Sequence, residues 1–325
     1  MLTRRTFLAS ASASFLAGPA LAQSYPTQTI RIIAGFPPGG GIDISARLVS
    51  EPLKNALGQT VIVENRTGAA GMLAANTVAK AAPDGHMLLM ATSGEIAISP
   101  HLYKDKMTYD PRRELTPIAL IGIVPCVVVV ADSTPVHNPQ ELIAYAKANA
   151  GKLSFSSSGV GNPQQLAGEL MNMMAGTNVL HVPYRGAAPA VTDVATGAVS
   201  MSFSSLAAAL PLIKAGKLRA VAVTSKDRMP QLPDVAPLSE GPGLAGYELL
   251  NWFGMFTTGG TPSEIVDRLN DIVNTALLSP SISDKLTAQG IVPRLMNAKE
   301  YASFVESETD KFGKIVEQAH IMLEN

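Results

Sequence analysis

Short apolar runs rich in β-branched residues alternate with stretches of helical periodicity from residue 29 to the end of the chain. The runs predict strands at 29–34, 61–64, 87–92, 124–131, 153–157, 181–184, 200–204, 218–224 and 249–257. Helical stretches lie at about 43–57, 71–81, 138–149, 186–196, 206–215 and 298–323, with two more that begin near 163 and 262. Strands separated by helices are typical of parallel sheets covered by helices, so we predict an α/β fold.

The strand–helix pattern runs through two similar cycles, which are followed by a return strand and two helices. This order predicts two lobes joined by two crossing segments near 120–128 and 246–256. We expect residues 23–122 and 250–325 to form a discontinuous first lobe and residues 123–249 to form the second. In open α/β sheets, ligands bind beyond the carboxyl ends of the strands. The two lobes would therefore enclose a cleft that closes by hinge motion.

The first 22 residues read as an export signal. Arg4 and Arg5 precede an apolar run that ends in Ala20-Leu-Ala22, a pattern typical of a cleaved signal peptide. The paired arginines also fit a twin-arginine signal, so both that route and ordinary secretion stay open. We expect a periplasmic protein, because no later apolar run is long enough to span a membrane and no cysteine follows the cleavage site to accept lipid.

Charge and composition exclude several functional classes. Removing Arg4 and Arg5 with the signal leaves 23 basic against 26 acidic residues, a net charge of −3, which argues against nucleic-acid binding. Cys126 is the single cysteine and lies in an apolar run, which favours a buried thiol over a catalytic one. The five histidines are scattered, and we expect neither a metal site nor a cofactor.

A glycine-rich loop, Gly35-Phe-Pro-Pro-Gly-Gly-Gly-Ile-Asp43, joins the first strand to the first helix. Uncovered backbone N–H groups at a helix start make a site for an anion. The loop lacks the Lys-Ser or Lys-Thr of a phosphate-binding loop and the spacing of a dinucleotide fingerprint. We expect ligand contact here, and Asp43 either caps the helix or contacts the ligand.

A second loop, Ser156-Ser-Ser-Gly-Val-Gly161, precedes a helix whose cap and first residue are Asn162 and Pro163. Its hydroxyls and glycines predict a second anion site, and Thr92 with Ser93 would add donors to the same cleft. The loop lacks the spacing of a nucleophile elbow. Since the sequence shows neither a nucleophile–base pair nor a metal cluster, we expect a binding protein rather than an enzyme.

These motifs resemble those of the Bug/TctC family of periplasmic solute receptors for tripartite tricarboxylate transporters. The resemblance extends over nearly all of the mature length. The matching segments are Phe36-Pro-Pro-Gly-Gly40 with Asp43 and Arg47, Pro83-Asp-Gly85, Leu166-Ala-Gly-Glu169, His181-Val-Pro-Tyr-Arg-Gly186, Lys217-Leu-Arg-Ala220 and Leu232-Pro-Asp-Val235.

The resemblance implies a two-lobed Venus-flytrap protein that closes on a small organic acid and delivers it to integral-membrane transporter subunits. It implies that one carboxylate is held largely by main-chain groups and ordered water from the two glycine-rich loops. We expect a monomer. The site residues that it implies are Phe36, Pro38, Gly39, Gly40, Gly41, Asp43, Thr92, Ser93, Ser157, Ser158, Gly159, Gly161, Asn162, Gln164, Ser204 and Ser205.

Two departures from the family pattern bear on the ligand. Gln165 stands where the family often has a histidine, and Ser204-Ser205 stands where it often has Asp-Asn. Loss of that acid removes a partner for an amino group, so we predict a dicarboxylate, hydroxy acid or aromatic acid without a cationic amine. Two other functions stay open from the sequence: a carboxylate receptor that signals to a membrane sensor kinase, and an exported hydrolase or transferase.

Overall fold

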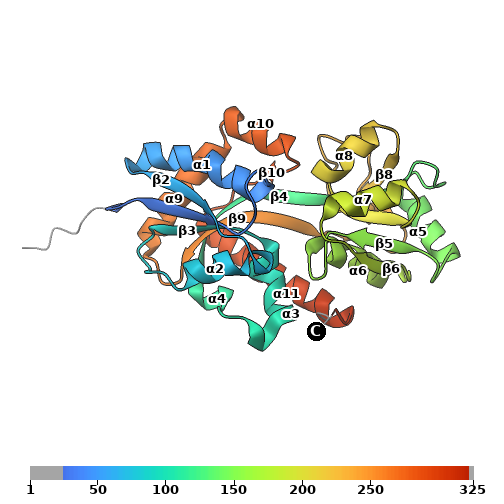
Figure 1. The fold of residues 1–325 in the computed structure, drawn as a ribbon, viewed down its shortest axis with the longest axis horizontal. Helices are drawn as coiled ribbons and strands as arrows, with labels where there is room; N and C mark the ends of the chain where they lie inside the picture. Colours follow the sequence, from blue (N-terminus) through green and yellow to red (C-terminus); the bar gives the residue numbers. More distant parts are fainter. Residues whose placement is uncertain (1–24, 322–325) are drawn as a thin grey trace, which may run out of the picture.

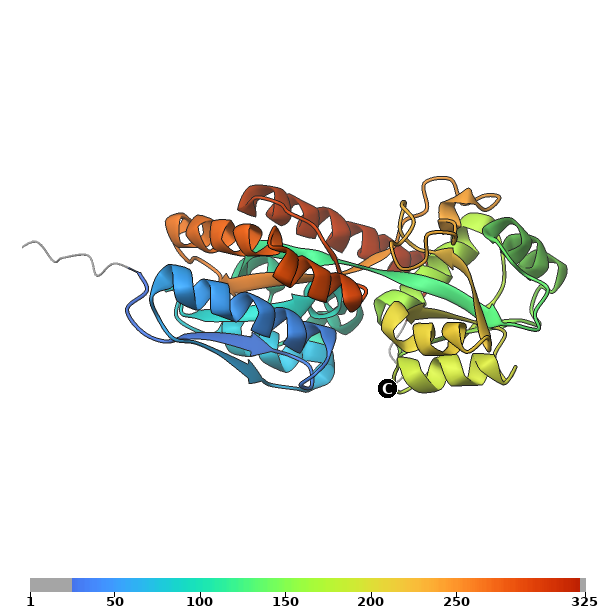
Figure 2. The ribbon, with the colours of Figure 1, turned by 90° about the horizontal axis from the view of Figure 1, so that it is seen from above.

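Two lobes lie side by side in the computed structural model, which describes residues 25–321 (Figures 1 and 2). Strands β4 (Leu115–Ala131) and β9 (Leu250–Thr258) pair antiparallel and run between the lobes. The predicted two-lobed α/β fold with two crossing segments is therefore confirmed. The predicted signal peptide lies outside the described residues, and the exact lobe boundaries stay a prediction.

The first lobe is built on a mixed sheet in the order β2-β1-β3-β9-β4. Parallel strands β2 (Val61–Asn65), β1 (Ile30–Ala34) and β3 (Met87–Thr92) are followed by the antiparallel β9, and the short β10 (Val292–Pro293) pairs with β4. Because both faces of this sheet are covered, β1 is apolar at successive positions. Ile32 packs into one apolar cluster and Ile33 into another.

Helices cover the two faces of the first lobe's sheet. Residues from α1 (Gly41–Leu57), α9 (Ser263–Leu277) and α10 (Pro280–Ala288) share one core with the sheet. Residues from α2 (Met72–Ala79) and α11 (Ala298–Gln318) share the other, with α3 (Ser99–Tyr103) and α4 (Pro111–Glu114) nearby (Figure 1). Helix α11 also packs against α6 (Pro163–Ala175) of the second lobe.

The second lobe repeats the plan on the far half of β4. Its strands are β5 (Ser154–Ser157), β6 (Leu180–Pro183), β7 (Met201–Ser205) and β8 (Leu218–Val223), and its helices are α5 (Pro139–Ala148), α6 (Pro163–Ala175), α7 (Ala187–Ala195) and α8 (Leu206–Lys214). Strand β5 lies parallel to β6 and β7, while β4 pairs antiparallel with β7 and β8. Asn138 and Asn162 cap α5 and α6 as predicted, each accepting a backbone N–H.

Three parts of the predicted element pattern were wrong. The strand at 124–131 is only the second half of β4, which begins at Leu115. Helices α3, α4 and α10 and a π-helix at Gly94–Ile98 were missed, and α11 ends at Gln318 rather than near 323. Between residues 25 and 321, no helix has the length and apolar character needed to span a membrane.

Candidate functional site

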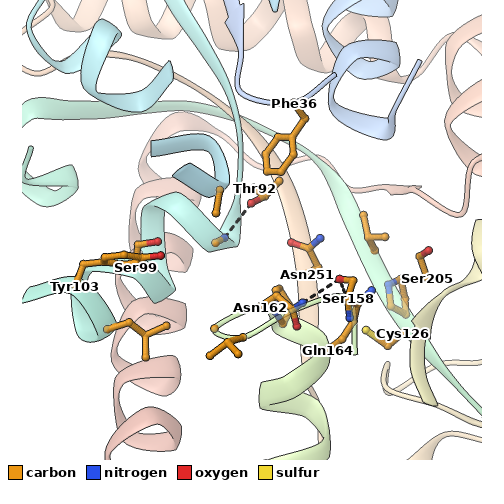
Figure 3. Close-up of a pocket in the computed structure, with 18 residues that line it drawn as sticks. Phe36, Thr92, Ser99, Tyr103, Cys126, Ser158, Asn162, Gln164, Ser205 and Asn251 are labelled. Atoms are coloured by element: carbon orange, nitrogen blue, oxygen red, sulfur yellow. Dashed lines mark hydrogen bonds between the residues drawn. The ribbon is translucent and has the colours of Figure 1, made fainter. Parts of the chain in front are cut away.

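A cavity of about 200 Å³ lies between the lobes, where β1, β3, β5 and β7 end (Figure 3). This volume is below the ~300–1,000 Å³ of pockets for drug-sized molecules, so it suits a smaller solute. Its wall draws on both lobes and on the two crossing strands. The lining residues are Phe36, Ala70, Thr92, Gly94, Ser99, Leu102, Tyr103, Val124, Pro125, Cys126, Ser158, Val160, Gly161, Asn162, Pro163, Gln164, Ser205 and Asn251.

The second-lobe wall is formed by the loop after β5 and the first turn of α6. The Gln164 side-chain oxygen accepts hydrogen bonds from the backbone N–H and the hydroxyl of Ser158, and the Asn162 amide donates to that hydroxyl at 2.9 Å. The Gln164 oxygen is thus occupied, and no acceptor in residues 25–321 takes its amide N–H groups. They lie at the cavity wall beside the positive end of the α6 dipole, where an anion is stabilised.

Asn251, at the start of β9, is a second wall residue whose side-chain oxygen is bonded within the protein, as in Gln164. Its side-chain oxygen accepts from the Ser93 hydroxyl and from the Trp252 N–H, both at 2.9 Å. The two N–H groups of the Asn251 amide therefore remain for a ligand. Ser93 itself is fully buried and off the wall, so it positions Asn251 rather than facing the cavity.

The first-lobe wall comes from the end of β3 and from α3. Thr92, Ser99 and Tyr103 bring hydroxyls to the cavity, and Phe36 covers it from the loop after β1 (Figure 3). Behind Thr92 lies Glu95, whose side chain is fully buried in the π-helix. Burial raises the pKa of the Glu95 carboxyl to about 7, although hydrogen bonds from Thr92 oppose the rise.

The first glycine-rich loop contributes less to the wall than the sequence predicted. Gly40 is the N-cap residue of α1, and the Asp43 carboxylate accepts from the Gly39 N–H at 2.9 Å. Arg47 and Asn65 also bind this carboxylate. Burial alone would raise the Asp43 pKa, but the bonds from Arg47, Gly39 and Asn65 lower it below its usual value. The start of α1 therefore already holds an anion, its own Asp43.

Phe36 is the one residue of this loop that reaches the wall in the described structure. Pro38, Gly39 and Gly40 are exposed, and Asp43 is buried away from the cavity. At Gly41, an added Cβ would lie 2.8 Å from the Phe253 ring, so close packing explains this glycine. Of the two roles left open for Asp43, the bond to the Gly39 N–H favours capping of the α1 start, although the N-cap residue itself is Gly40. Ligand contact by the rest of the loop stays a prediction.

Among the other expected site residues, Thr92, Ser158, Gly161, Asn162, Gln164 and Ser205 lie on the wall. Ser157, Gly159 and Ser204 do not. The buried Ser157 hydroxyl lies 2.7 Å from the His181 ring nitrogen and donates to the Gly159 carbonyl, which fixes the loop that follows. Burial lowers the His181 pKa to about 4, which keeps this ring neutral. Tyr103, Ser99 and Asn251 were missed by sequence reasoning.

The wall carries no formal charge, since its lining residues include no Lys, Arg, His, Asp or Glu. The Cys126 thiol on the wall is almost fully buried, and burial raises its pKa to about 12. A thiol with that pKa stays protonated and is a poor nucleophile. Within residues 25–321, no cluster of His, Cys, Asp or Glu is arranged to hold a metal ion. The arrangement can hold a solute through neutral hydrogen-bond donors.

Comparison with known proteins gives a family match over most of the chain. Residues 45–321 match the family described as "Tripartite tricarboxylate transporter family receptor". A UPF0065 protein from the tcbD-tcbE intergenic region of a Pseudomonas species is 36% identical over 316 residues, covering 96% of this chain and 94% of that protein. Protein BugT of Bordetella pertussis is 32% identical, with coverage of 96% and 94%.

Solved structures agree with this match. An R. palustris protein determined with adipate is 35% identical, with a TM-score of 0.78 over 92% of this chain and 99% of that one. MatC from Rhodopseudomonas palustris, determined with bound malate, is 30% identical, with a TM-score of 0.73 over 90% of this chain and 100% of that one.

Proposed function

The chain belongs to the tripartite tricarboxylate transporter receptor family, and we propose that it captures a small organic carboxylate between its lobes. The family that the motifs predicted is thus confirmed. As an exported receptor, the protein would act in the periplasm and deliver its ligand to integral-membrane transporter subunits. Relatives determined with adipate and malate support a small organic acid as the ligand class.

The observation that carries the proposal is the set of outward amide donors on an uncharged wall. Gln164 and Asn251 each have their side-chain oxygen engaged by protein donors, so each presents N–H groups to the cavity. Hydrogen bonds to a charged acceptor contribute roughly 1.5–3 kcal/mol each, and the α6 N-terminus adds to them. A carboxylate held this way needs no arginine or lysine.

The wall also supports a ligand without a cationic amine. Family members often carry Asp-Asn where this chain has Ser204-Ser205, so the serine at the acid position is Ser204, which lies off the wall behind Ser205. The lining residues include no carboxylate. Burying an ammonium group without a partner is strongly unfavourable. We therefore propose a dicarboxylate, hydroxy acid or aromatic acid.

Calorimetric titration of the purified protein with a panel of organic acids tests the proposal. The panel pairs succinate with aspartate, glutarate with glutamate, and adds adipate and malate. We expect at least one acid without an amine to bind, and the amino acids to bind far more weakly. Tight binding of aspartate or glutamate, but not of the acids that lack the amine, would contradict the ligand class.

Gln164→Glu keeps the side-chain shape and replaces the donor with a carboxylate at the wall, so it should abolish binding. Gln140→Glu is a matched control, because Gln140 is exposed on α5 and does not line the cavity. Full affinity in Gln164→Glu would show that the ligand is held elsewhere.

A further inference from the structure

Glu95 is a buried acid directly behind the cavity wall. Its carboxyl accepts the Thr92 N–H at 2.8 Å through one oxygen and the Thr92 hydroxyl through the other. It packs against Gly71, where an added Cβ would lie 2.9 Å from the carboxyl carbon. In residues 25–321, no Lys, Arg or His side chain forms an ion pair or hydrogen bond with it. A buried carboxylate without a cation nearby is unfavourable, so burial favours the protonated form of Glu95.

The hydrogen bonds of the Thr92 hydroxyl can be counted in full. A threonine hydroxyl has one hydrogen and two lone pairs. The hydrogen goes to Glu95, and one lone pair accepts the Gly94 N–H at 3.0 Å. While Glu95 is ionised, the wall residue Thr92 can offer the cavity only a lone pair, which a ligand carboxylate cannot use.

A protonated Glu95 reverses this role. Its own O–H donates to the Thr92 oxygen, the Gly94 N–H occupies the other lone pair, and the Thr92 hydrogen becomes free to donate into the cavity. We propose that Glu95 is a positioning residue that sets Thr92 as donor or acceptor, so that a ligand carboxylate reaching Thr92 binds with uptake of one proton by Glu95. This inference rests on the proposed function.

The groups packed around Glu95 do not compete with it for a proton near neutral pH. Tyr109 donates its hydroxyl to the Glu95 backbone carbonyl, and Tyr301 faces the site from α11. Burial raises the pKa of both phenols, which keeps them neutral. The adjoining β3, α2 and residues 69–71 carry no ionisable side chain.

Two elements packed against the π-helix do carry ionisable side chains. On α3, the His101 ring is bonded to the Thr309 carbonyl, and Tyr103 lies on the cavity wall. On α11, the buried Glu308 pairs with Lys311. Each of these groups other than the wall tyrosine therefore has its own partner away from the Glu95 carboxyl.

The sign of the pH dependence follows from this linkage. In the free protein the Glu95 pKa is about 7, and a bound carboxylate that requires the protonated form raises it further. Affinity should therefore be highest below pH 7 and fall as the pH rises above 7. Between pH 6.5 and 8.5 the loss can reach about 25-fold, the limit for one linked proton with this starting pKa.

The test is calorimetric titration with adipate at pH 6.5 and 8.5, where carboxyl groups with pKa values near ~4.3 stay ionised. At pH 7.5, the titration is repeated in buffers of different ionisation enthalpy to count the protons taken up. We expect the wild-type protein and Thr92→Ser, which keeps the hydroxyl, to weaken at high pH and to take up a proton. Glu95→Gln can donate permanently to Thr92 and should bind equally at both pH values.

Glu308→Gln is the matched control, since Glu308 is another buried carboxyl with a pKa raised by burial but lies off the cavity wall. It should keep the wild-type pH dependence. Adipate binding that is independent of pH in the wild type, or a pH dependence that survives in Glu95→Gln, would overturn the inference while the proposed function stands. Absence of binding by every acid of the panel at both pH values would instead refute the proposed function, and this inference with it.

Discussion

Gly161 offers a sharp test of the way the two lobes meet in this structure, because it lies against Leu102 of the first lobe. Its φ of +73° lies in the left-handed region, and an added Cβ would lie 2.4 Å from the Leu102 Cδ1 atom on α3. Carbon atoms in contact are normally about 3.5–4.0 Å apart. Gly161→Ala therefore forces Leu102 to move or the lobes to separate by more than 1 Å.

Two effects of this substitution can be separated. The left-handed backbone should destabilise the fold by about 1–2 kcal/mol whether or not ligand is bound. The overlap with Leu102 exists only when the lobes meet. Because the overlapping atom is the end of a flexible side chain, we expect a cost of about 1 kcal/mol, the low end for overpacking. We expect the second effect to appear as a loss of ligand affinity of about 5-fold.

Gly176→Ala is the matched control, because Gly176 has a φ of +64° at the end of α6 and open space around its Cα. It should lose similar stability in urea unfolding but keep wild-type affinity in calorimetry. Leu102→Ala should restore affinity to Gly161→Ala, since it removes the overlapping side chain. Equal affinity of Gly161→Ala and Gly176→Ala would refute the view that ligand binds with the lobes in this contact.

Three further predictions follow from single groups. Asn251→Leu removes a wall donor and should weaken binding of the panel's tightest-binding acid about 10- to 150-fold in calorimetry; unchanged affinity would exclude Asn251 from the site. Asp43→Asn should lower the free energy of unfolding by about 1–3 kcal/mol at pH 7. Because the folded-state pKa of Asp43 is lowered, this difference should shrink as the pH falls below ~3.9, and a difference that is the same at pH 3 would count against the ion pair. The neutral, half-buried His181 should make the wild-type fold less stable as the pH falls from 6.5 to about 4, since the unfolded chain takes up the proton first. His181→Gln should lack this slope in urea unfolding, and a retained slope would assign it to another group.

The second-lobe half of the site could be predicted from sequence because its signals are local. Ser158, Gly161 and Asn162 lie within a few residues of one another, between the end of a strand and a capped helix. Such a segment has few ways to fold. Its hydroxyl, glycine and cap residues therefore reach the cavity wall together.

The first glycine-rich loop shows the limit of the same reasoning. Its glycines have structural causes that only the fold reveals, namely the Phe253 ring against Gly41 and the N-cap position of Gly40. The anion expected at the start of α1 is Asp43 of the chain itself, held by Arg47. Local sequence cannot distinguish an anion supplied by a ligand from one supplied by a side chain of the same loop, here Asp43, four residues after Gly39.

Residues that reach the wall because strands far apart in the sequence pair with each other could hardly be predicted from local sequence. Asn251 reaches the cavity because β9 pairs with β4, and its one clue is a polar residue within an apolar run. Pro117, Gly122 and Pro125 interrupt the pattern of β4, and the register of β4 against β9 shifts near the first two. Because of these interruptions, the sequence pattern predicted a strand only for the second half of β4. The two ends of β4 nevertheless belong to different lobes of the sequence-based prediction.

The most direct test of the account is a crystal structure of the protein with the acid that binds most tightly in calorimetry. We predict that one ligand carboxylate lies between the first turn of α6 and the start of β9, within hydrogen-bond distance of the amide nitrogens of Gln164 and Asn251. No Lys or Arg should contact that carboxylate. A ligand bound outside this cavity, or a carboxylate paired with a cationic side chain, would contradict the account.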